Sequence, residues 1–291
     1  MTVIGAPSTA EAVDPATARI DMKVLLITDG EADPTHGAWV ALLDGEGVPY
    51  DLFDAANTLT EADLRNGDHA YYQAVVCSIR CTELLGYESA EMAALDAFLA
   101  DFELRRIQGY VWPEPDLGLN PSVGDDRVGD SLTLTSAGAA VFPYLDGTIP
   151  LDDTWGYYPT VVDPAAFEIL AEGPGGLAVV GVYQNPAGFE ELVITIDSGD
   201  WQTHPKLLGH GLLNWVTKGV YLGYSRNYFT AHFDDIFMAD DRWDVDLNVT
   251  PGDTPASEPE PPPIRMVPAD VDRALQWQTD NGIRLDMVYN G

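Results

Sequence analysis

Two adjacent aspartates, Asp234 and Asp235, follow a short apolar run in the stretch HFDDIF, and four more acidic residues come within a dozen positions. Such a pair can do hydrolytic chemistry if one carboxylate binds a hard or borderline cation while its neighbour takes a proton from water. Both aspartates can equally be solvated loop acids, because the whole chain is acidic. The pattern alone leaves both interpretations open.

The charge balance bears on this choice. The 291 residues include 47 acidic and 14 basic side chains, which gives a formal net charge of -33 at pH 7. Such a field repels nucleic acid and anionic lipid, so we exclude both as partners. The acidic residues are spread along the chain, which favours a halophilic, salt-screened surface over a site for a cationic substrate.

The hydropathy of the chain and its first residues indicate which membrane and export signals to expect. No run of eighteen apolar residues is present, so we expect no membrane insertion. The first residues have neither a basic start nor an apolar segment, so we expect no secretory signal peptide in this chain. We expect residues 1–21 to form a short disordered leader.

The aspartate pair depends on the elements that come before it. The apolar run MKVLLITD, at 22–29, is typical of a strand buried on both faces of a parallel sheet. Asp33 is expected to cap the following helix, with Pro34 at its first position. Further elements are expected as strands at 49–55, 71–79 and 106–114 and as a helix from about 89 to 103. This alternation predicts an open, doubly wound α/β layer.

A β-rich insertion follows from about 116 to 165, and three strands separated by the turns GPGG and NPAG come after it. The glycine cluster at 173–176 precedes a strand rather than a helix, so it is a hairpin turn and not a phosphate cradle. A last helix begins near His204 and Pro205 and ends at Gly219. The first domain therefore covers 22–223.

The remaining segment, 224–291, holds a strand, a long Pro/Glu-rich loop, a helix from about Pro268 and a second strand. This is one βα step of a barrel or sheet, too little to close a barrel. Asp234 and Asp235 come where the first strand ends, and the active sites of α/β barrels lie at that end. His232 shares strand parity with Asp234, but a satisfied core histidine is the expected role.

The cysteines and aromatic residues are less informative. Cys77 and Cys81 form neither a disulfide framework nor a zinc cluster; we expect a buried small hydrophobe and a free thiol, respectively. Cys81 lacks the flanking glycines of a nucleophile elbow, so a working glutaminase is not expected. Aromatic side chains that can either stack on sugar rings or pack in the core are Trp112, Trp155, Tyr157 and Tyr158.

HFDDIF resembles the first motif of metal-dependent polysaccharide deacetylases. The closer resemblance is to the group that acts on amino-sugar exopolysaccharides such as fungal galactosaminogalactan. It rests on HFDD at 232–235, DRW at 241–243 and RMVPADVDRALQWQ at 265–278. The domain before these motifs is similar to the glutamine-amidotransferase-like module of such proteins. The implied fold is thus an amidotransferase- or flavodoxin-like sheet with a β-rich insertion, followed by the first βα unit of a deacetylase (β/α) barrel.

The resemblance also implies a function: metal-dependent N-deacetylation of an amino-sugar polysaccharide outside the cell or at its surface. Asp234 takes the role of general base and Asp235 that of a ligand to a divalent cation, expected to be zinc. The family's H-x-x-x-H ligand motif has no counterpart after residue 235, so we expect either a fragment of a longer protein or a remnant without catalysis. The alternative is a non-catalytic carbohydrate-binding or scaffold module with an amidotransferase-like fold.

Overall fold

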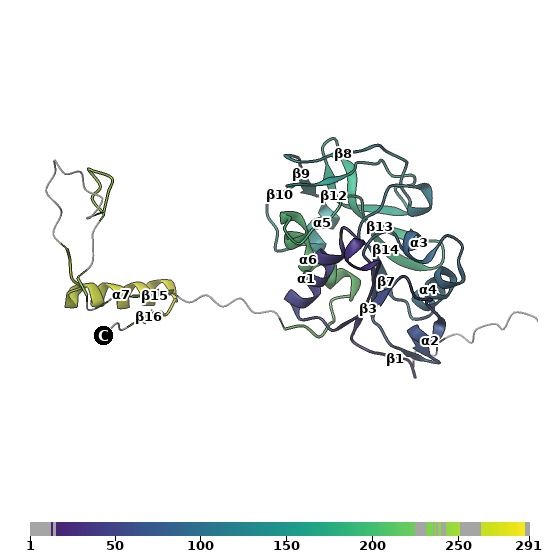
Figure 1. Cartoon of the computed structure of the whole chain (residues 1–291), viewed down its shortest axis with the longest axis horizontal. Coiled ribbons are helices and arrows are strands. Elements are labelled where there is room, and N and C mark those ends of the chain that lie inside the picture. Colours follow the sequence, from purple (N-terminus) through teal and green to yellow (C-terminus); the bar gives the residue numbers. More distant parts are fainter. Residues whose placement is uncertain are drawn as a thin grey trace, which may run out of the picture. The chain divides into compact units, whose positions relative to one another are not determined.

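The computed structural model describes residue 13 and residues 16–224, 231–234, 236, 238–239, 243–250 and 263–288. The chain divides into two compact units, Met1–Ser225 (unit 1) and Arg226–Gly291 (unit 2). Among the described helices, none is both long and apolar enough to span a membrane. The fold is mixed α/β, with one large sheet in unit 1 (Figure 1).

The parallel part of the large sheet has the spatial order β3-β2-β6-β7-β14. Renumbered along the chain, this order is 2-1-3-4-5, one of the two common orders of doubly wound sheets. An antiparallel extension continues it as β13-β12-β9-β10. The bounds are β2 Val24–Thr28, β3 Tyr50–Asp54, β6 Ala74–Cys77, β7 Arg105–Gln108, β9 Ser131–Leu134, β10 Thr148–Pro150, β12 Phe167–Gly173, β13 Leu177–Asn185 and β14 Phe189–Ile194.

Helices cover both faces of the parallel strands, as the apolar run at the start of the chain predicts. All five residues of β2 are buried, and they alternate between two cores. Val24 and Leu26 pack with residues of α1 and α6, whereas Leu25 and Ile27 pack with residues of α3 and α4 (Figure 1). A strand with this alternation has no solvent face, which explains why its first four residues are all apolar.

The helices of unit 1 are α1 His36–Glu46, α2 Glu61–Leu64, α3 Cys81–Leu85, α4 Ala90–Asp101, α5 Ser136–Val141 and α6 Thr203–Val216, with 3-10 turns η1 Gly30–Ala32 and η2 Pro115–Leu117. Helix α4 has the predicted start, because the Ser89 side chain accepts a hydrogen bond from the Met92 amide at 3.0 Å. The expected cap of α1 is wrong: the N-cap residue is Thr35, and Asp33 turns inward to other partners.

Several small elements lie outside the main sheet. Strands β1 Arg19–Ile20, β4 Arg65–Asn66 and β5 His69–Ala70 form a three-stranded sheet, so part of the expected disordered leader is a strand. In the insertion, β8 Gly124–Asp126 pairs with β11 Trp155–Tyr157. The predicted turn between β12 and β13 is present, where Gly175 and Gly176 adopt positive φ angles of 79° and 75°.

A buried ion pair joins two neighbouring strands of the large sheet. Arg106 on β7 lies opposite Glu191 on β14, and its Nη2 atom is 2.7 Å from a Glu191 carboxylate oxygen. Gln108 donates a further hydrogen bond to the same oxygen at 2.7 Å. Both charged side chains are almost fully buried. Arg106 also pairs with Asp96 at 2.7 Å, and its charge compensates the buried Glu191 carboxylate.

Unit 2 contains a single parallel β–α–β step, formed by β15 Ala231–Phe233, α7 Pro268–Asn281 and β16 Leu285–Met287. The predicted helix and second strand are therefore present, and the described residues form no closed barrel. Helix α7 has no buried residue, and Val271, Leu275 and Trp277 are 38%, 51% and 45% exposed. One step supplies no second layer to bury these side chains.

Candidate functional site

Asp234 lies immediately after the last residue of β15, at the carboxyl end of that strand. The His232 Nε2 atom is 3.4 Å from a carboxylate oxygen of Asp234. Both side chains are about half exposed, so the expectation of a core histidine at position 232 is wrong. An exposed carboxylate with an imidazole beside it is able to accept a proton from a bound water molecule.

The other residues of the predicted site are less well defined. Asp235, the expected metal ligand, lies outside the described residues, as do Asp241 and Arg242 of the second motif. Trp243 is 51% exposed. The acidic residues that follow form a turn in which Asp244 accepts hydrogen bonds from the amides of residues 246 and 247 at 2.9 Å and 3.0 Å. Part of this acidic stretch therefore has a structural role.

A metal centre needs several donor side chains in one place. Within the described ranges, no group of three or more histidine, cysteine, aspartate or glutamate side chains is placed to hold a metal ion. His232 and Asp234 supply two such groups. A catalytic zinc ion is held by three protein ligands, so these two side chains do not complete a zinc site.

The carboxyl ends of β2 and β6 meet at the point where the strand order reverses, the usual ligand site of a doubly wound sheet. Here the buried Asp33 carboxylate accepts hydrogen bonds from the Thr28 hydroxyl at 3.3 Å and the Thr35 amide at 2.8 Å. The Thr35 and Ser78 hydroxyls also donate to it. The carboxylate is saturated by its own chain, so this cluster is structural. The adjoining residues Gly30–Ala32 form the 3-10 turn η1.

Cys77 is fully buried, as predicted, but it is bonded to Cys81 in a disulfide. The expectation of a free thiol at Cys81 is therefore wrong. Cys81 begins helix α3 only four residues after the end of β6, which brings the two sulfur atoms together. A disulfide-bonded cysteine is no nucleophile, which agrees with the absence of a glutaminase motif.

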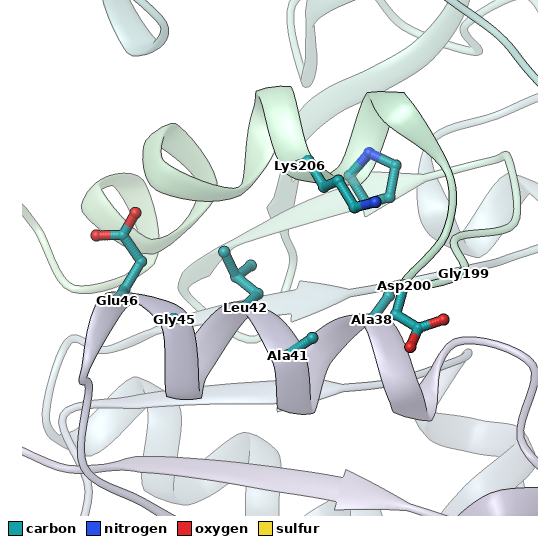
Figure 2. A pocket seen from close by; sticks show the side chains of 9 residues that line it. Ala38, Ala41, Leu42, Gly45, Glu46, Gly199, Asp200 and Lys206 are labelled. Atoms are coloured by element: carbon teal, nitrogen blue, oxygen red, sulfur yellow. The ribbon is translucent and has the colours of Figure 1, made fainter. Parts of the chain in front are cut away.

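A groove of about 250 Å³ lies between α1 and the start of α6 (Figure 2). On the α1 side, the groove is lined by the small residues Ala38, Ala41 and Gly45. The charged residues that line it are Glu46, Asp200 and Lys206. Glu46 is 3.1 Å from His210 Nδ1, and Lys206 Nζ donates to the Trp201 carbonyl oxygen at 3.3 Å. The groove has space for a small ligand, but its charged groups are not arranged around one reacting point.

His204, in the first turn of α6, is buried at 1% exposure. Its Nε2 atom is 2.8 Å from the Asp197 carbonyl oxygen, whereas its Nδ1 atom is buried and has no partner within the described part of the chain. Burial lowers the pKa of His204 to about 4, and burial also raises the pKa of the Asp197 carboxyl. His204 is therefore neutral at pH 7 and sensitive to acid.

The four aromatic residues considered for sugar stacking divide into two kinds. Trp155 is 47% exposed, whereas Trp112, Tyr157 and Tyr158 are partly buried. Tyr157 stacks on Tyr110 with a centroid distance of 6.4 Å. Sequence reasoning missed Trp201, which is 62% exposed. The available signal is a lone indole among the small and polar residues of SGDWQT, between a strand and a helix.

Comparison with known proteins gives one informative similarity. No protein-family model matches the chain, and no curated protein sequence matches it. The solved structure of Agd3, a novel carbohydrate deacetylase, matches 94% of this chain with a TM-score of 0.72 and 19% identity, and the match covers 43% of the Agd3 chain. The chain therefore has a deacetylase-like fold and spans less than half the length of Agd3. At 19% identity the similarity concerns the fold alone.

Two further structures match smaller parts of the chain. A cold-adapted beta-galactosidase from Rahnella sp. R3 matches 70% of it with 14% identity and a TM-score of 0.45, covering 32% of the galactosidase chain. The protein SMU.1228c matches 70% with 12% identity and a TM-score of 0.36, covering 89% of that chain. TM-scores this low do not establish a shared fold.

Proposed function

We propose that this chain takes part in the N-deacetylation of an amino-sugar polysaccharide, with Asp234 as the general base. The observation that carries the proposal is the position of Asp234 at the carboxyl end of β15, in a parallel step of a chain with a deacetylase-like fold. In α/β barrels the residues that do chemistry lie at that end of the strands.

In the proposed reaction, Asp234 removes a proton from a water molecule while the water oxygen attacks the carbonyl carbon of the acetamide group. The C–N bond then breaks, acetate is released, and the amine nitrogen of the sugar leaves with a proton. His232, at 3.4 Å, orients the Asp234 carboxylate. The proton that Asp234 takes from water is passed on to the leaving amine nitrogen, which restores the carboxylate.

The role of a metal stays a proposal that depends on more ligands. A zinc ion would polarise the acetamide carbonyl and the attacking water. Its described donors here are two side chains, which is fewer than a zinc site needs. Asp235 is the proposed ligand of the divalent cation, and the further ligands would have to come from outside the described residues. We therefore assign no step of the reaction to the metal.

Two features support proposals for the fold type of unit 1 and for the location of the protein. The 2-1-3-4-5 order of the parallel strands supports a flavodoxin- or amidotransferase-like unit 1, with the β-rich segment as an insertion. The disulfide between Cys77 and Cys81 supports an extracellular or cell-surface location, because disulfides persist in oxidising compartments. Both agree with a protein that acts on an exported polymer.

The second candidate function is a non-catalytic carbohydrate-binding or scaffold module. Unit 1 favours it, because its carboxylate cluster at Asp33 is saturated and its cysteines form a disulfide. Neither feature leaves a reactive group free for catalysis. In this case unit 1 holds the polymer and hydrolysis occurs elsewhere.

Acetate release separates the two functions. The polypeptide should be purified as its source cell makes it and incubated with an N-acetylated galactosamine or glucosamine polymer. Deacetylation predicts that acetate and free amine appear in equal amounts, and that a polymer without acetyl groups yields no acetate. Binding of the polymer with no release of acetate would refute the deacetylase proposal and support the scaffold.

A further inference from the structure

Trp201 holds its ring flat against the backbone of its own loop. A Cβ atom added to Gly199 would lie 2.6–2.7 Å from Cη2, Cζ2 and Cζ3 of the ring. Near-equal distances to three consecutive ring atoms mean that Gly199 lies under the face of the ring and not at its edge. Gly199 is buried, while Trp201 is 62% exposed, so the opposite face of the indole is open to solvent.

A second exposed indole lies at the start of strand β11. Trp155, on β11, is 47% exposed, and a Cβ atom at Gly124 of the paired strand would lie 3.0 Å from its Nε1 atom. The same Cβ position is 2.8 Å from Cε1 of Tyr157. Glycine at 124 thus leaves space for both rings on one face of the β8–β11 ribbon, where any larger residue would displace them.

The two segments that carry the indoles, residues 152–156 and residues 197–203, are hydrogen-bonded to each other. The Trp201 Nε1 atom donates to the Asp153 carboxylate at 3.0 Å, and the Trp155 amide donates to the Asp197 carboxylate at 3.1 Å. The Thr203 amide and hydroxyl each donate to Asp152 at 2.9 Å. Two large aromatic surfaces are therefore held in place before any ligand arrives, which lowers the entropy lost on binding.

The charge around the indoles identifies the kind of ligand that fits. Three exposed acids, Asp152, Asp153 and Asp200, lie in these two segments. Two bases contact the same segments: Lys206 Nζ donates to the Trp201 carbonyl oxygen at 3.3 Å, and Arg127 Nε donates to the Gly156 carbonyl oxygen at 3.0 Å. An aromatic face packs against the C–H face of a pyranose, and it also attracts a cation placed over it. A sugar with a free ammonium group satisfies both the indoles and the carboxylates.

We propose that Trp155 and Trp201 form a platform on unit 1 that binds an amino-sugar polymer whose acetyl groups have been removed. This inference takes its substrate class from the proposed function and concerns a surface of unit 1, separate from Asp234. The platform retains the cationic product chain, so that a polymer from which acetyl groups have already been removed stays bound.

The test is affinity electrophoresis of residues 1–291 in native gels that contain chitosan, a soluble glucosamine polymer, or the same polymer after partial re-N-acetylation, which keeps it in solution. The variants are Trp155→Ala and Trp201→Ala. The matched control is Tyr87→Ala, an aromatic residue on unit 1 that is 52% exposed. Trp201→Tyr keeps a ring without the indole N–H, and circular dichroism checks that each variant is folded.

The platform predicts that each tryptophan-to-alanine change weakens chitosan binding by roughly tenfold or more, equal to about 1.4 kcal/mol. Tyr87→Ala should bind like the parent, Trp201→Tyr should restore most of the affinity, and the acetylated polymer should bind more weakly. None of these variants changes the charge of the protein. Equal chitosan binding by all of them would show that only the general negative charge acts, and the platform would be refuted.

The outcome does not depend on catalysis. Loss of binding in the tryptophan variants, together with no acetate release by the polypeptide as its source cell makes it, would support the platform and refute the deacetylase proposal. Acetate release with unchanged binding in the variants would refute the platform alone. An absence of chitosan binding by the parent chain, even at low salt, would also refute it.

Discussion

His204 should make the stability of unit 1 depend on pH in a defined range. Its pKa is about 4 in the folded chain, against an ordinary value of 6.5, because burial disfavours the charged imidazolium. The unfolded chain therefore binds a proton that the folded chain resists. The contribution of neutral His204 to the free energy of unfolding is fully present above pH 6.5. This contribution is lost as the pH falls from 6.5 to 4.

The size of this effect follows from the two values. At 1.36 kcal/mol for each pH unit, the gap between them corresponds to about 3 kcal/mol. Between pH 7.5 and pH 4.5 the parent should lose about 2–3 kcal/mol more unfolding free energy than His204→Gln. Glutamine does not titrate, and its amide can replace the Nε2 donor to the Asp197 carbonyl oxygen.

Urea unfolding at the two pH values measures this difference. The control is His210→Gln, because His210 lies on the same helix with its side chain 46% exposed. Asp152 and Asp197, the acids nearest His204, remain in every variant. If His204→Gln keeps the full acid sensitivity of the parent, the buried, neutral state assigned to His204 is wrong.

Three further predictions concern activity, charge and the core. Residues 1–291 alone should release no acetate from chitin oligomers or acetylated galactosamine polymers, because the sequence lacks the histidine ligands; release above a metal-free control would contradict this. The melting temperature should rise by several degrees from 0.01 M to 1 M salt, as the Debye length falls from about 30 Å to about 3 Å, and a flat curve would show that the 47 acids are no salt adaptation. Arg106→Met should cost about 3–5 kcal/mol in urea unfolding, because it leaves Glu191 buried without its partner. Lys23→Met, which removes an exposed pair, should cost at most about 1 kcal/mol, and equal losses would refute the argument.

Local patterns predicted most of the elements that the structure contains. The apolar run around Val24–Thr28, the start of α4 near residue 89 and the glycine turn at 173–176 each depend on neighbouring residues only. The parallel β–α–β step of unit 2 was predicted for the same reason. Element ends were less accurate, because the strands stop where the sheet pairing stops.

Long-range partners explain where the prediction failed. The residues next to Asp33 predict a helix cap, but the hydroxyl of Ser78, which directly follows β6, donates a hydrogen bond to the Asp33 carboxylate. His232 was predicted to be a core residue because it belongs to an apolar strand, yet the described residues of unit 2 supply no second layer to cover it. The flat seating of Trp201 on Gly199 depends on loop geometry that no periodicity encodes.

The candidate site was predictable only as a position. The spacing of strand and acids placed Asp234 at the carboxyl end of β15, and its role as a base remains a proposal. Asp235 lies outside the described residues, so its role as a ligand remains a proposal too. The fold similarity to Agd3 does not decide either role.

The central claim is that Asp234 is the general base of a deacetylase, and acetate release by Asp234→Asn tests it most directly. The polypeptide should again be made as in its source cell, with Asp246→Asn as a matched control for loss of one exposed acid in unit 2. A general base predicts that Asp234→Asn lowers turnover by roughly 10²–10⁴ while the control keeps the parent rate. Near-normal acetate release by Asp234→Asn would contradict the assignment.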